Sequence, residues 1–381
     1  MSKLDDLLKQ YCPEGVVYQP LEKILKIKNG ADYKKFPEGD IPVYGSGGIM
    51  AYVDRYVYDK PSVLIPRKGS LDKLYYVDSP FWNVDTIFYT MIYTEIVEPR
   101  YVYHCLLREH LEQYNTAGGV PSLTQTVLNK IKIPVPPLEV QREIVRILDN
   151  FTELTAELTA ELTARKKQYE YYRSEMLTFD LGIPKKKLGQ TCDMKAGKSI
   201  PSELISSEET QYANVKCYGG NGIRGYVNEA NQHGEFPLIG RQGALCGNVN
   251  YATGDFYATE HAVVVKSQGE YKQRFLFHLL TFMDLNQYKS AGAQPGLSVK
   301  KLQEIEAPVP SLEVQDRIVN ILDNFEKICN DLNIGLPAEI EARQKQYEFY
   351  RDQLLTFAEN GETILTDRQT DRQTDRQTDR I

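Results

Sequence analysis

Apolar positions along this chain follow two periods, and each period predicts a different kind of element. Short runs rich in Val, Ile and Tyr, bounded by Gly and Pro, are typical of strands; examples are residues 63–65, 87–89 and 262–265. Residues 100–114 and 272–288 instead carry apolar side chains three and four positions apart, which is the spacing of one helix face. The mixture predicts α+β domains with irregular, loop-rich faces.

Two longer segments have the pattern of extended helices. Residues 138–178 contain neither proline nor glycine, and an unbroken helix there would extend about 60 Å at ~1.5 Å per residue. The second segment begins after Ser311, is interrupted at residues 335–337 and continues to about residue 357. Both segments carry apolar stripes that require partners, and we expect the two helices to pack on each other; packing of each helix on its own domain is the alternative. The stripes comprise Leu154, Leu158, Leu162, Ile340, Tyr347 and Leu354.

The whole plan occurs twice in the chain. Residues 134–141 return almost unchanged as residues 308–315, at an offset of 174 that also relates Arg67 to Arg241. An offset that holds through loops and helices indicates one duplicated domain plan. We therefore predict two similar α+β domains separated by two long helices that pack as an antiparallel coiled coil, with an internal pseudo-two-fold repeat. The predicted segments are a first domain at 1–136, a helical spacer at 137–180, a second domain at 181–310, a second helical spacer at 311–358 and a tail at 359–381.

Composition places the chain among ordinary soluble globular proteins. Of its residues, 41% are apolar and 25% are charged, which is typical of that class. The length of 381 residues allows two or three domains. The six cysteines are scattered without a C-x-x-C pair and the five histidines are dispersed, which favours a reducing compartment and predicts no metal site. We find no secretion signal and no apolar run of membrane length, so we expect a cytoplasmic protein that contacts no membrane.

The charge balance gives a mixed indication about nucleic acids. A formal net charge of −7 argues mildly against DNA binding, because a basic contact face is expected of a DNA-binding protein. Lysines nevertheless gather at corresponding places in the two halves, which would leave basic surfaces if the acidic residues lie elsewhere. A merely solvated basic surface is the alternative. The clusters are Lys23, Lys26, Lys28, Lys34 and Lys35 in the first half, and Lys185, Lys186, Lys187, Lys195 and Lys198 in the second.

Two pairs of corresponding loops carry the candidate binding chemistry. Residues 44–48 and 218–222 both begin with Tyr-Gly, and glycine lets a backbone approach a phosphate closely. In the second pair, the shared Arg67 and Arg241 are predicted phosphate or structural anchors. The residue after each arginine differs: a lysine suits guanine and a glutamine suits adenine in the major groove. Tight turns and ordinary surface loops are the alternatives.

The residues predicted to bind DNA are spread over both halves. They are Lys28, Tyr44, Ser46, Arg67, Lys68, Ser70, Lys198, Asn221, Arg224, Arg241 and Gln242. Residues 116–124 and 290–298 are predicted to close their domains as turns. Trp82, the single tryptophan, is predicted to pack in a core, and no catalytic residue is predicted.

The segments around the long helices resemble a known family. Residues 136–151 read Pro-Pro-Leu-Glu-Val-Gln-Arg-Glu-Ile-Val-Arg-Ile-Leu-Asp-Asn-Phe, and residues 165–173 read Arg-Lys-Lys-Gln-Tyr-Glu-Tyr-Tyr-Arg. Both strings, and their second copies within residues 311–351, resemble the conserved helical region of specificity subunits of type I restriction-modification systems. The strings at Tyr11–Val16, Ile41–Gly48 and Asn83–Thr86 are similar to the target recognition domains of that family. The resemblance extends to about residue 358.

The resemblance implies a non-catalytic DNA-recognition role. In that family two target recognition domains each read one half of a bipartite, gapped site in double-stranded DNA. The helices dock two methyltransferase subunits, and restriction-translocase subunits complete the complex. S-adenosylmethionine, ATP and magnesium are expected on those partners, with no cofactor in this chain. The helix residues implied to bind partners are Leu138, Gln141, Tyr169, Leu312, Gln315 and Tyr347.

Other functions are open from the residues alone. A stand-alone methyltransferase or nuclease is disfavoured, because the sequence contains neither an Asn/Asp-Pro-Pro-aromatic motif nor a G-x-x-x-x-G-K-[ST] phosphate loop. A purely structural coiled-coil scaffold is disfavoured by the two α+β domains. Within the family, a silent allele that donates recognition domains by recombination is a further possibility.

Two short repeats suggest further properties. Residues 155–162 read Thr-Ala-Glu-Leu twice, and one such unit adds about 6 Å and about 40° beyond a full turn of helix. We hypothesise that the number of units tunes the spacer between half-sites. The tail repeats Thr-Asp-Arg-Gln from residue 366, lacks apolar side chains there and is predicted to be disordered. A tetranucleotide ACAG, repeated and read in triplets, would encode that period, which suggests phase-variable expression; an inert tail is the alternative.

Overall fold

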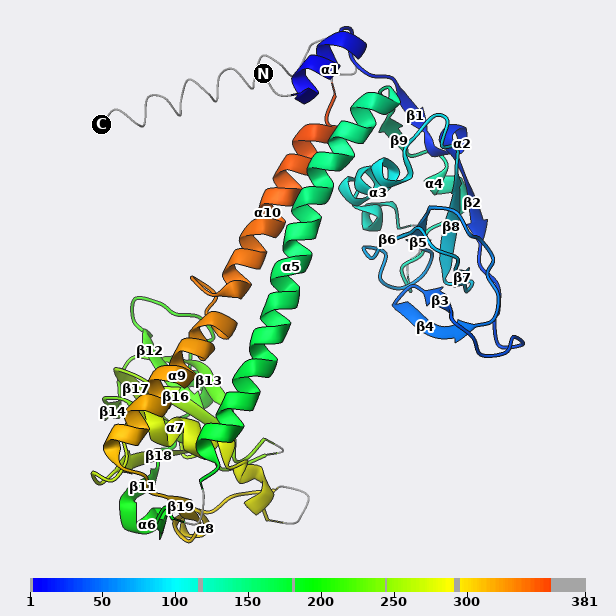
Figure 1. Cartoon of the computed structure of the whole chain (residues 1–381). Helices are drawn as coiled ribbons and strands as arrows, with labels where there is room; N and C mark the ends of the chain where they lie inside the picture. Colours follow the sequence, from blue (N-terminus) through cyan, green and yellow to red (C-terminus); the bar gives the residue numbers. More distant parts are fainter. Residues whose placement is uncertain (1–2, 116–118, 180–181, 244, 291–294, 358–381) are drawn as a thin grey trace, which may run out of the picture. The chain divides into compact units, whose positions relative to one another are not determined.

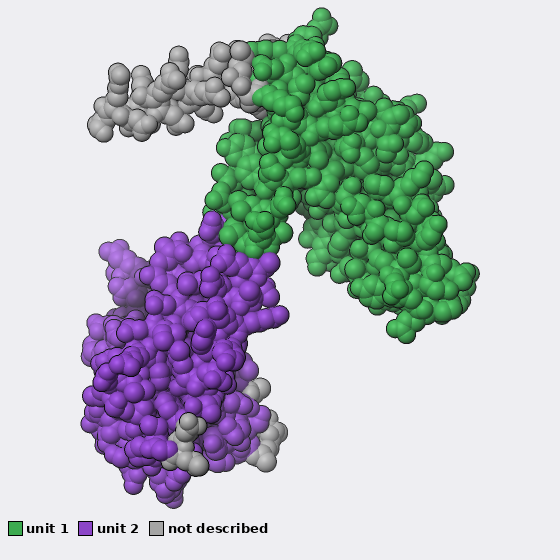
Figure 2. Space-filling view, viewed as in Figure 1, with its two compact units in different colours: residues 1–158, 340–381 green, residues 159–339 purple. Residues whose placement is uncertain are grey.

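The structure, a computed structural model, describes residues 3–115, 119–179, 182–243, 245–290 and 295–357. These residues form two compact units (Figure 2). The first unit combines residues 1–158 with 340–381, and the second contains residues 159–339. The predicted tail at 359–381 lies outside the described residues. None of the helices in the described part of the chain has the length and apolarity that a membrane span needs.

The first unit contains an α+β domain that ends in a long helix (Figure 1). Strand order is β2-β8-β5-β6 in a four-stranded sheet and β4-β3-β7 in a three-stranded sheet, and β1 pairs with β9. The elements of this first repeat are α1 (Lys3–Tyr11), β1 (Tyr18–Pro20), α2 (Leu21–Ile24), β2 (Leu25–Asn29), β3 (Ile41–Gly45), β4 (Gly48–Val53), β5 (Ser62–Pro66), β6 (Tyr75–Val77), β7 (Trp82–Asn83), β8 (Ile87–Ile92), α3 (Pro99–Arg108), η1 (Leu111–Tyr114), α4 (Gln125–Leu128), β9 (Lys132–Pro134) and α5 (Leu138–Leu177). From residue 159 onward, α5 belongs to the second unit.

The second unit repeats this plan. Its four-stranded sheets have the orders β11-β18-β15-β16 and β13-β12-β17-β14, and β10 pairs with β19. The elements of this second repeat are β10 (Lys185–Lys187), α6 (Leu188–Thr191), β11 (Cys192–Ala196), η2 (Ser202–Leu204), β12 (Val215–Gly219), β13 (Gly222–Val227), β14 (Gln232–His233), β15 (Phe236–Gly240), β16 (Val249–Ala252), β17 (Asp255–Ala258), β18 (Ala262–Ser267), α7 (Gln273–Phe282), η3 (Leu285–Tyr288), α8 (Val299–Gln303), β19 (Glu306–Pro308), α9 (Leu312–Asn330) and α10 (Leu336–Leu355). From residue 340 onward, α10 belongs to the first unit.

Most predicted elements are confirmed, with one shared error. The strands predicted at 63–65, 87–89 and 262–265 correspond to β5, β8 and β18. The helices predicted at 100–114 and 272–288 are each broken in two. His110 and Asp284, again 174 residues apart, adopt left-handed backbone conformations with φ of 45° and 44°. Such a residue cannot continue a right-handed helix, so α3 and α7 end and a separate 3₁₀ turn follows.

The two long helical segments differ in continuity. Helix α5 is unbroken over 40 residues, whereas its counterpart is divided into α9 and α10. At the break, the Asp331 carboxylate accepts hydrogen bonds from the backbone N–H groups of Asn333 and Ile334. A Cβ atom at Gly335 would lie 2.6 Å from the carbonyl oxygens of both Lys327 and Asp331, so only glycine fits this close approach.

Aromatic contacts show that the helices form an antiparallel pair. In the first unit, the ring of Phe151 on α5 stacks on Tyr350 of α10, with centroids 5.2 Å apart. In the second unit, Tyr169 and Tyr172, later on α5, contact Phe325 on the earlier helix α9. Residue numbers therefore rise along one helix as they fall along the other. The start of α5 also packs on its own domain, where Val140, Ile144 and Leu148 are buried in the core, so the two predicted modes of packing coexist.

A buried glutamine joins each domain to its long helix. The Gln141 side-chain carbonyl accepts from the backbone N–H of Glu98 at 2.8 Å, and its NH₂ group donates to the carbonyls of Ile96 and Pro136. Gln315 makes the same three bonds, with the backbone groups of Lys272, Glu270 and Pro310. Both side chains are fully buried. The partner-binding role predicted for Gln141 and Gln315 is therefore wrong, because neither presents a free polar group.

A buried histidine adds a second connection in each unit. His104 on α3 lies 2.9 Å from the Asp149 carboxylate of α5, which Arg100 also binds. His278, Asp323 and Arg274 repeat this network on α7 and α9. In the first unit only one ring nitrogen faces the carboxylate. The other, Nδ1 of His104, lies 2.9 Å from the Tyr347 hydroxyl of α10.

These contacts fix the histidine tautomer and the role of Tyr347. A neutral ring whose Nε2–H donates to Asp149 leaves Nδ1 to accept from the Tyr347 hydroxyl. Burial lowers the pKa of His104, although the Asp149 carboxylate opposes that shift. Tyr347 is only 4% exposed and is bonded inside its own unit, so its predicted partner-binding role is wrong.

We predict that Gln141→Leu destabilises the first unit by about 2–4 kcal/mol. The substitution leaves three backbone groups without their hydrogen-bond partner. The fully buried group, the Pro136 carbonyl, costs about 1–3 kcal/mol, and the two part-buried groups cost less. Trp82 lies in the first unit, so its fluorescence during urea unfolding reports on that unit. Gln10→Leu, at an exposed position on α1, is the control and should change stability by less than about 0.5 kcal/mol. Equal losses of stability in the two variants would show that Gln141 does not hold the domain to its helix.

We further predict that acid weakens the first unit through His104. Because the pKa of His104 is lowered in the folded state, the unfolded chain binds a proton there at a pH at which the folded chain does not. The free energy of unfolding should therefore fall as pH decreases below about 6.5, by up to about 1.4 kcal/mol per pH unit. His104→Gln should remove this slope, and His110→Gln at an exposed position is the matched control. An unchanged slope in His104→Gln would show that the linkage lies elsewhere.

Candidate nucleic-acid interface

The loops singled out in the first half converge on Thr86. The backbone N–H groups of Arg67 and Lys68 both donate to the Thr86 carbonyl, at 2.8 and 3.3 Å. The backbone N–H of Ser46 lies 3.4 Å from the Thr86 hydroxyl. The turn between β3 and β4, the loop after β5 and the turn before β8 therefore lie together at one end of the domain. Ser70 is exposed in the same loop as Lys68.

The corresponding loops of the second half converge on His261. The Arg241 N–H donates to the His261 carbonyl at 3.0 Å, as Arg67 does to Thr86. The loop after each arginine also contacts the segment that precedes the short helix α4 or α8. Gly69 N–H donates to Pro121, and Gly243 N–H donates to Pro295, each at 3.1 Å.

A glycine is required at the same point of both loops. Gly69 and Gly243 have φ values of +86° and +87°, a left-handed conformation that side chains with a Cβ rarely adopt. A second hydrogen bond joins the same two segments: the N–H groups of Leu123 and Leu297 donate to the carbonyls of Arg67 and Arg241, both at 2.9 Å. The two halves thus share one set of backbone hydrogen bonds around Arg67–Gly69 and Arg241–Gly243, called the loop frame below.

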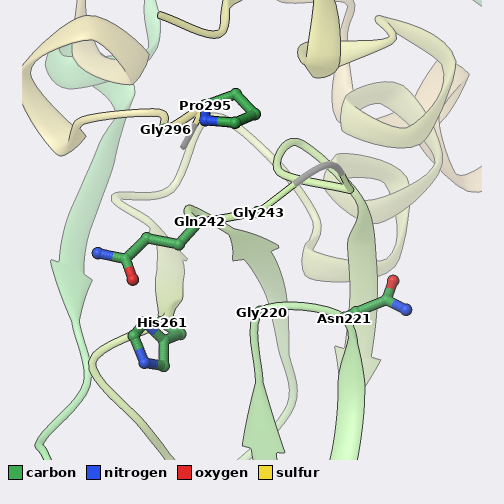
Figure 3. A pocket seen from close by; sticks show the side chains of 7 residues that line it. All are labelled: Gly220, Asn221, Gln242, Gly243, His261, Pro295 and Gly296. Carbon is green, nitrogen blue, oxygen red and sulfur yellow. The ribbon is translucent and has the colours of Figure 1, made fainter. Parts of the chain in front are cut away.

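In the second unit this frame surrounds a pocket of about 540 Å³ (Figure 3). Gln242 and His261 extend on one side of it and Asn221 on the other. The Asn221 side-chain carbonyl accepts from the amide of Asn248 at 2.6 Å, which anchors Asn221 in place. The pocket is lined by Gly220, Asn221, Gln242, Gly243, His261, Pro295 and Gly296.

His261 lines the pocket and was not among the residues predicted from the sequence to bind DNA. Its Nε2 lies 3.2 Å from the Glu260 carboxylate, and its Nδ1 is buried without a hydrogen-bond partner among the described residues. The corresponding Thr86 lies in the Asn83–Thr86 string that resembles the family. Each of the two residues directly precedes a buried strand, which begins at Ile87 in the first unit and at Ala262 in the second. This position was the signal available in the sequence.

Four predicted DNA-binding residues lie outside the loop contacts around Thr86 and His261. Lys28 is exposed on β2, opposite Tyr89 of β8. Tyr44 packs against Phe81, and burial raises its pKa, so it serves the domain core. The exposed Arg224 on β13 donates to the Ser202 hydroxyl. The backbone N–H of the exposed Lys198 donates to the Ala258 carbonyl.

The remaining predicted residues have mixed placements. Trp82 packs edge-on against Phe36 and donates its indole N–H to the Ala31 carbonyl. Of the predicted partner-binding residues, Leu312 is 47% exposed and Leu138 is half-buried. Within the predicted closing turns, residues 116–118 and 291–294 lie outside the described residues.

One group of side chains has the donor types of a metal site. Ligand atoms of His278, Asp323 and Glu326 lie within 4.8 Å of one another. The Arg274 guanidinium, however, pairs with both carboxylates. The first unit contains the corresponding His104, Asp149 and Arg100 network. The group therefore belongs to the joint between domain and helix.

Two copies of one α+β domain, each fixed to a long helix and each presenting the same frame of polar loops, define a tandem recognition protein. The chain belongs to the type I restriction-modification DNA specificity family, whose domain model matches residues 13–165 and again residues 182–342.

Known proteins of this family align over most of the chain. The specificity subunit of the Escherichia coli type I restriction enzyme EcoprrI is 38% identical over 374 residues, which cover 87% of this chain and 93% of that protein. A type I restriction enzyme specificity subunit of Haemophilus influenzae is 30% identical and covers 90% of this chain and 96% of its own length. The solved S subunit from M. genitalium shares the fold, with a TM-score of 0.64 at 18% identity, over 89% of this chain and 96% of that one.

Proposed function

We propose that this chain is the non-catalytic DNA-recognition subunit of a type I restriction-modification complex. It reads a bipartite, gapped site in double-stranded DNA and directs adenine methylation or restriction by its partner subunits. The family membership and the long alignments with specificity subunits support this function. The reaction itself belongs to the partners, which would bind S-adenosylmethionine, ATP and magnesium in the cytoplasm.

The observation that carries the proposal is the duplicated loop frame with unlike side chains. The same backbone bonds recur around Thr86 and His261, which fixes the loops in the same way in both units. The side chains on that frame differ, as Lys68 and Gln242 do. Two similar but non-identical readers in one chain suit a DNA target with two different half-sites. Phosphate contacts from Arg67 and Arg241 would position the two readers.

The helices are the proposed docking site for two methyltransferase subunits. Leu312 supports this role, because it is 47% exposed at the start of α9. Gln315, one turn later, points inward and only fixes the helix. Restriction-translocase subunits would join the resulting complex. The contacts with partners would therefore come from exposed apolar positions of the helices and not from the buried polar ones.

We predict a bipartite methylation motif that depends on this gene. N6-methyladenine should be mapped by long-read sequencing in cells that express the chain together with its neighbouring methyltransferase. The expected result is a gapped motif with two unlike halves, which disappears when this gene is deleted and returns when it is restored. Good expression of both proteins without any gapped motif would refute the proposed function.

We also predict that deleting residues 159–162 changes the spacer between the half-sites by one or two base pairs. The deletion shortens α5 by about 6 Å and rotates it by about 40°. DNA advances roughly 3.4 Å and 34–36° per base pair. Both half-sites should be retained in the mapped motif.

The control for the deletion changes composition without changing length. Thr159→Ala combined with Glu161→Gln should leave the spacer as it is in the native protein. An unchanged spacer in the deletion variant, with methylation retained, would disprove tuning by the Thr-Ala-Glu-Leu units.

A further inference from the structure

The pocket of the second unit is lined by polar residues that differ from their counterparts in the first unit. Its frame is common to both units, down to the φ values of Gly69 and Gly243 and the bonds around them. The side chains carried by this frame differ between the two units. Lys68 in the first unit corresponds to Gln242 in the second, and Thr86 corresponds to His261. A shared backbone that carries unlike polar side chains is the arrangement that can give two half-sites different sequences.

The chemistry of Gln242 indicates which base it suits. The side chain is exposed, and no hydrogen bond to its amide is found among the described residues. An amide offers one acceptor and a donor side by side, which matches N6 and N7 of adenine in the major groove. Lys68 offers donors alone, which match O6 and N7 of guanine. The same position would therefore read different purines in the two units.

His261 supplies a second polar group in the same pocket. The Glu260 carboxylate lies beside its Nε2, so Nε2–H is the donor there and Nδ1 remains an acceptor. That Nδ1 lacks a partner among the described residues. A buried polar atom without a partner is costly, and a hydrogen-bond donor from a bound molecule would relieve this cost after a small ring movement. An exocyclic amino group of a base is such a donor.

We propose that the second-unit pocket reads an adenine-containing base pair, with Gln242 as the residue that selects adenine and His261 as a second contact to the same or the adjacent pair. The inference rests on the proposed function, because it assigns residues and a base to one of the two half-sites. The corresponding pair in the first unit, Lys68 and Thr86, sets the preference of the other half-site.

The test uses the complete complex of this chain with its methyltransferase. Purified complex methylates a library of duplexes in which both half-sites are randomised, and the methylated molecules are sequenced. With Gln242→Lys, preference at one position of one half-site should move from adenine toward guanine, by roughly tenfold to a hundredfold. Gln242→Ala should instead relax that position, and His261→Thr should alter the same position or its neighbour. The other half-site should remain unchanged in all three variants.

Matched variants separate recognition from stability. Gln268→Lys makes the same substitution at an exposed position of the second unit outside the frame, and should leave both half-sites unchanged. Lys68→Gln is the reciprocal change and should act on the opposite half-site. A native half-site without adenine at the affected position would overturn the inference. So would loss of all methylation in both Gln242 variants, since removal of one base contact should relax one position only.

The outcomes also distinguish this inference from the proposed function. If the native complex selects no gapped motif, the proposed function fails first. If the native complex selects such a motif and both Gln242 variants leave every position unchanged, only the assignment of Gln242 is overturned. Changes in both half-sites from a single Gln242 substitution would likewise overturn it.

Discussion

The structure of each half depends on one buried amide. Gln141 and Gln315 each satisfy three backbone groups where a domain meets its long helix. A side chain that holds groups from two segments at once leaves the helix little freedom to pivot. The histidine–aspartate pair farther along each helix adds a second point of attachment. Two points define a direction, so the loop frame of each domain keeps a set orientation relative to its own helix.

The C-terminal repeat contributes residues to the core of the first unit. Helix α10 belongs to the C-terminal repeat, yet Tyr347 is bonded to His104 and the Arg108 guanidinium donates to the Leu355 carbonyl. Leu354 and Leu355 are buried in the core of the first unit. The corresponding place in the second unit is taken by the end of α5, where Leu177 is buried. Each domain therefore holds the start of one long helix and the end of the other.

Much of this organisation was predictable from the sequence, and the exceptions have physical causes. The constant offset and the apolar periods revealed the duplicated domains and the antiparallel helices. Gln141 was misassigned because a glutamine on an amphipathic helix usually faces solvent, and only the fold brings three unpaired backbone groups to it. His110 gives no sign of a left-handed backbone. His261 joins the pocket through tertiary contacts with loops that are distant in sequence, which a linear pattern cannot show.

The two ends of the described chain meet in the first unit. The Tyr18 hydroxyl donates to the Phe357 carbonyl at 3.1 Å and lies 3.4 Å from the Phe357 backbone N–H. Segments from the N-terminal part and the C-terminal part of the described chain therefore lie side by side within one unit. A circular permutant that opens in the segment before β10 and continues from α10 into α1 would retain the described interactions of both units. In such a permutant the repeat that is now second would come first in the gene, while each unit would keep the contacts described above.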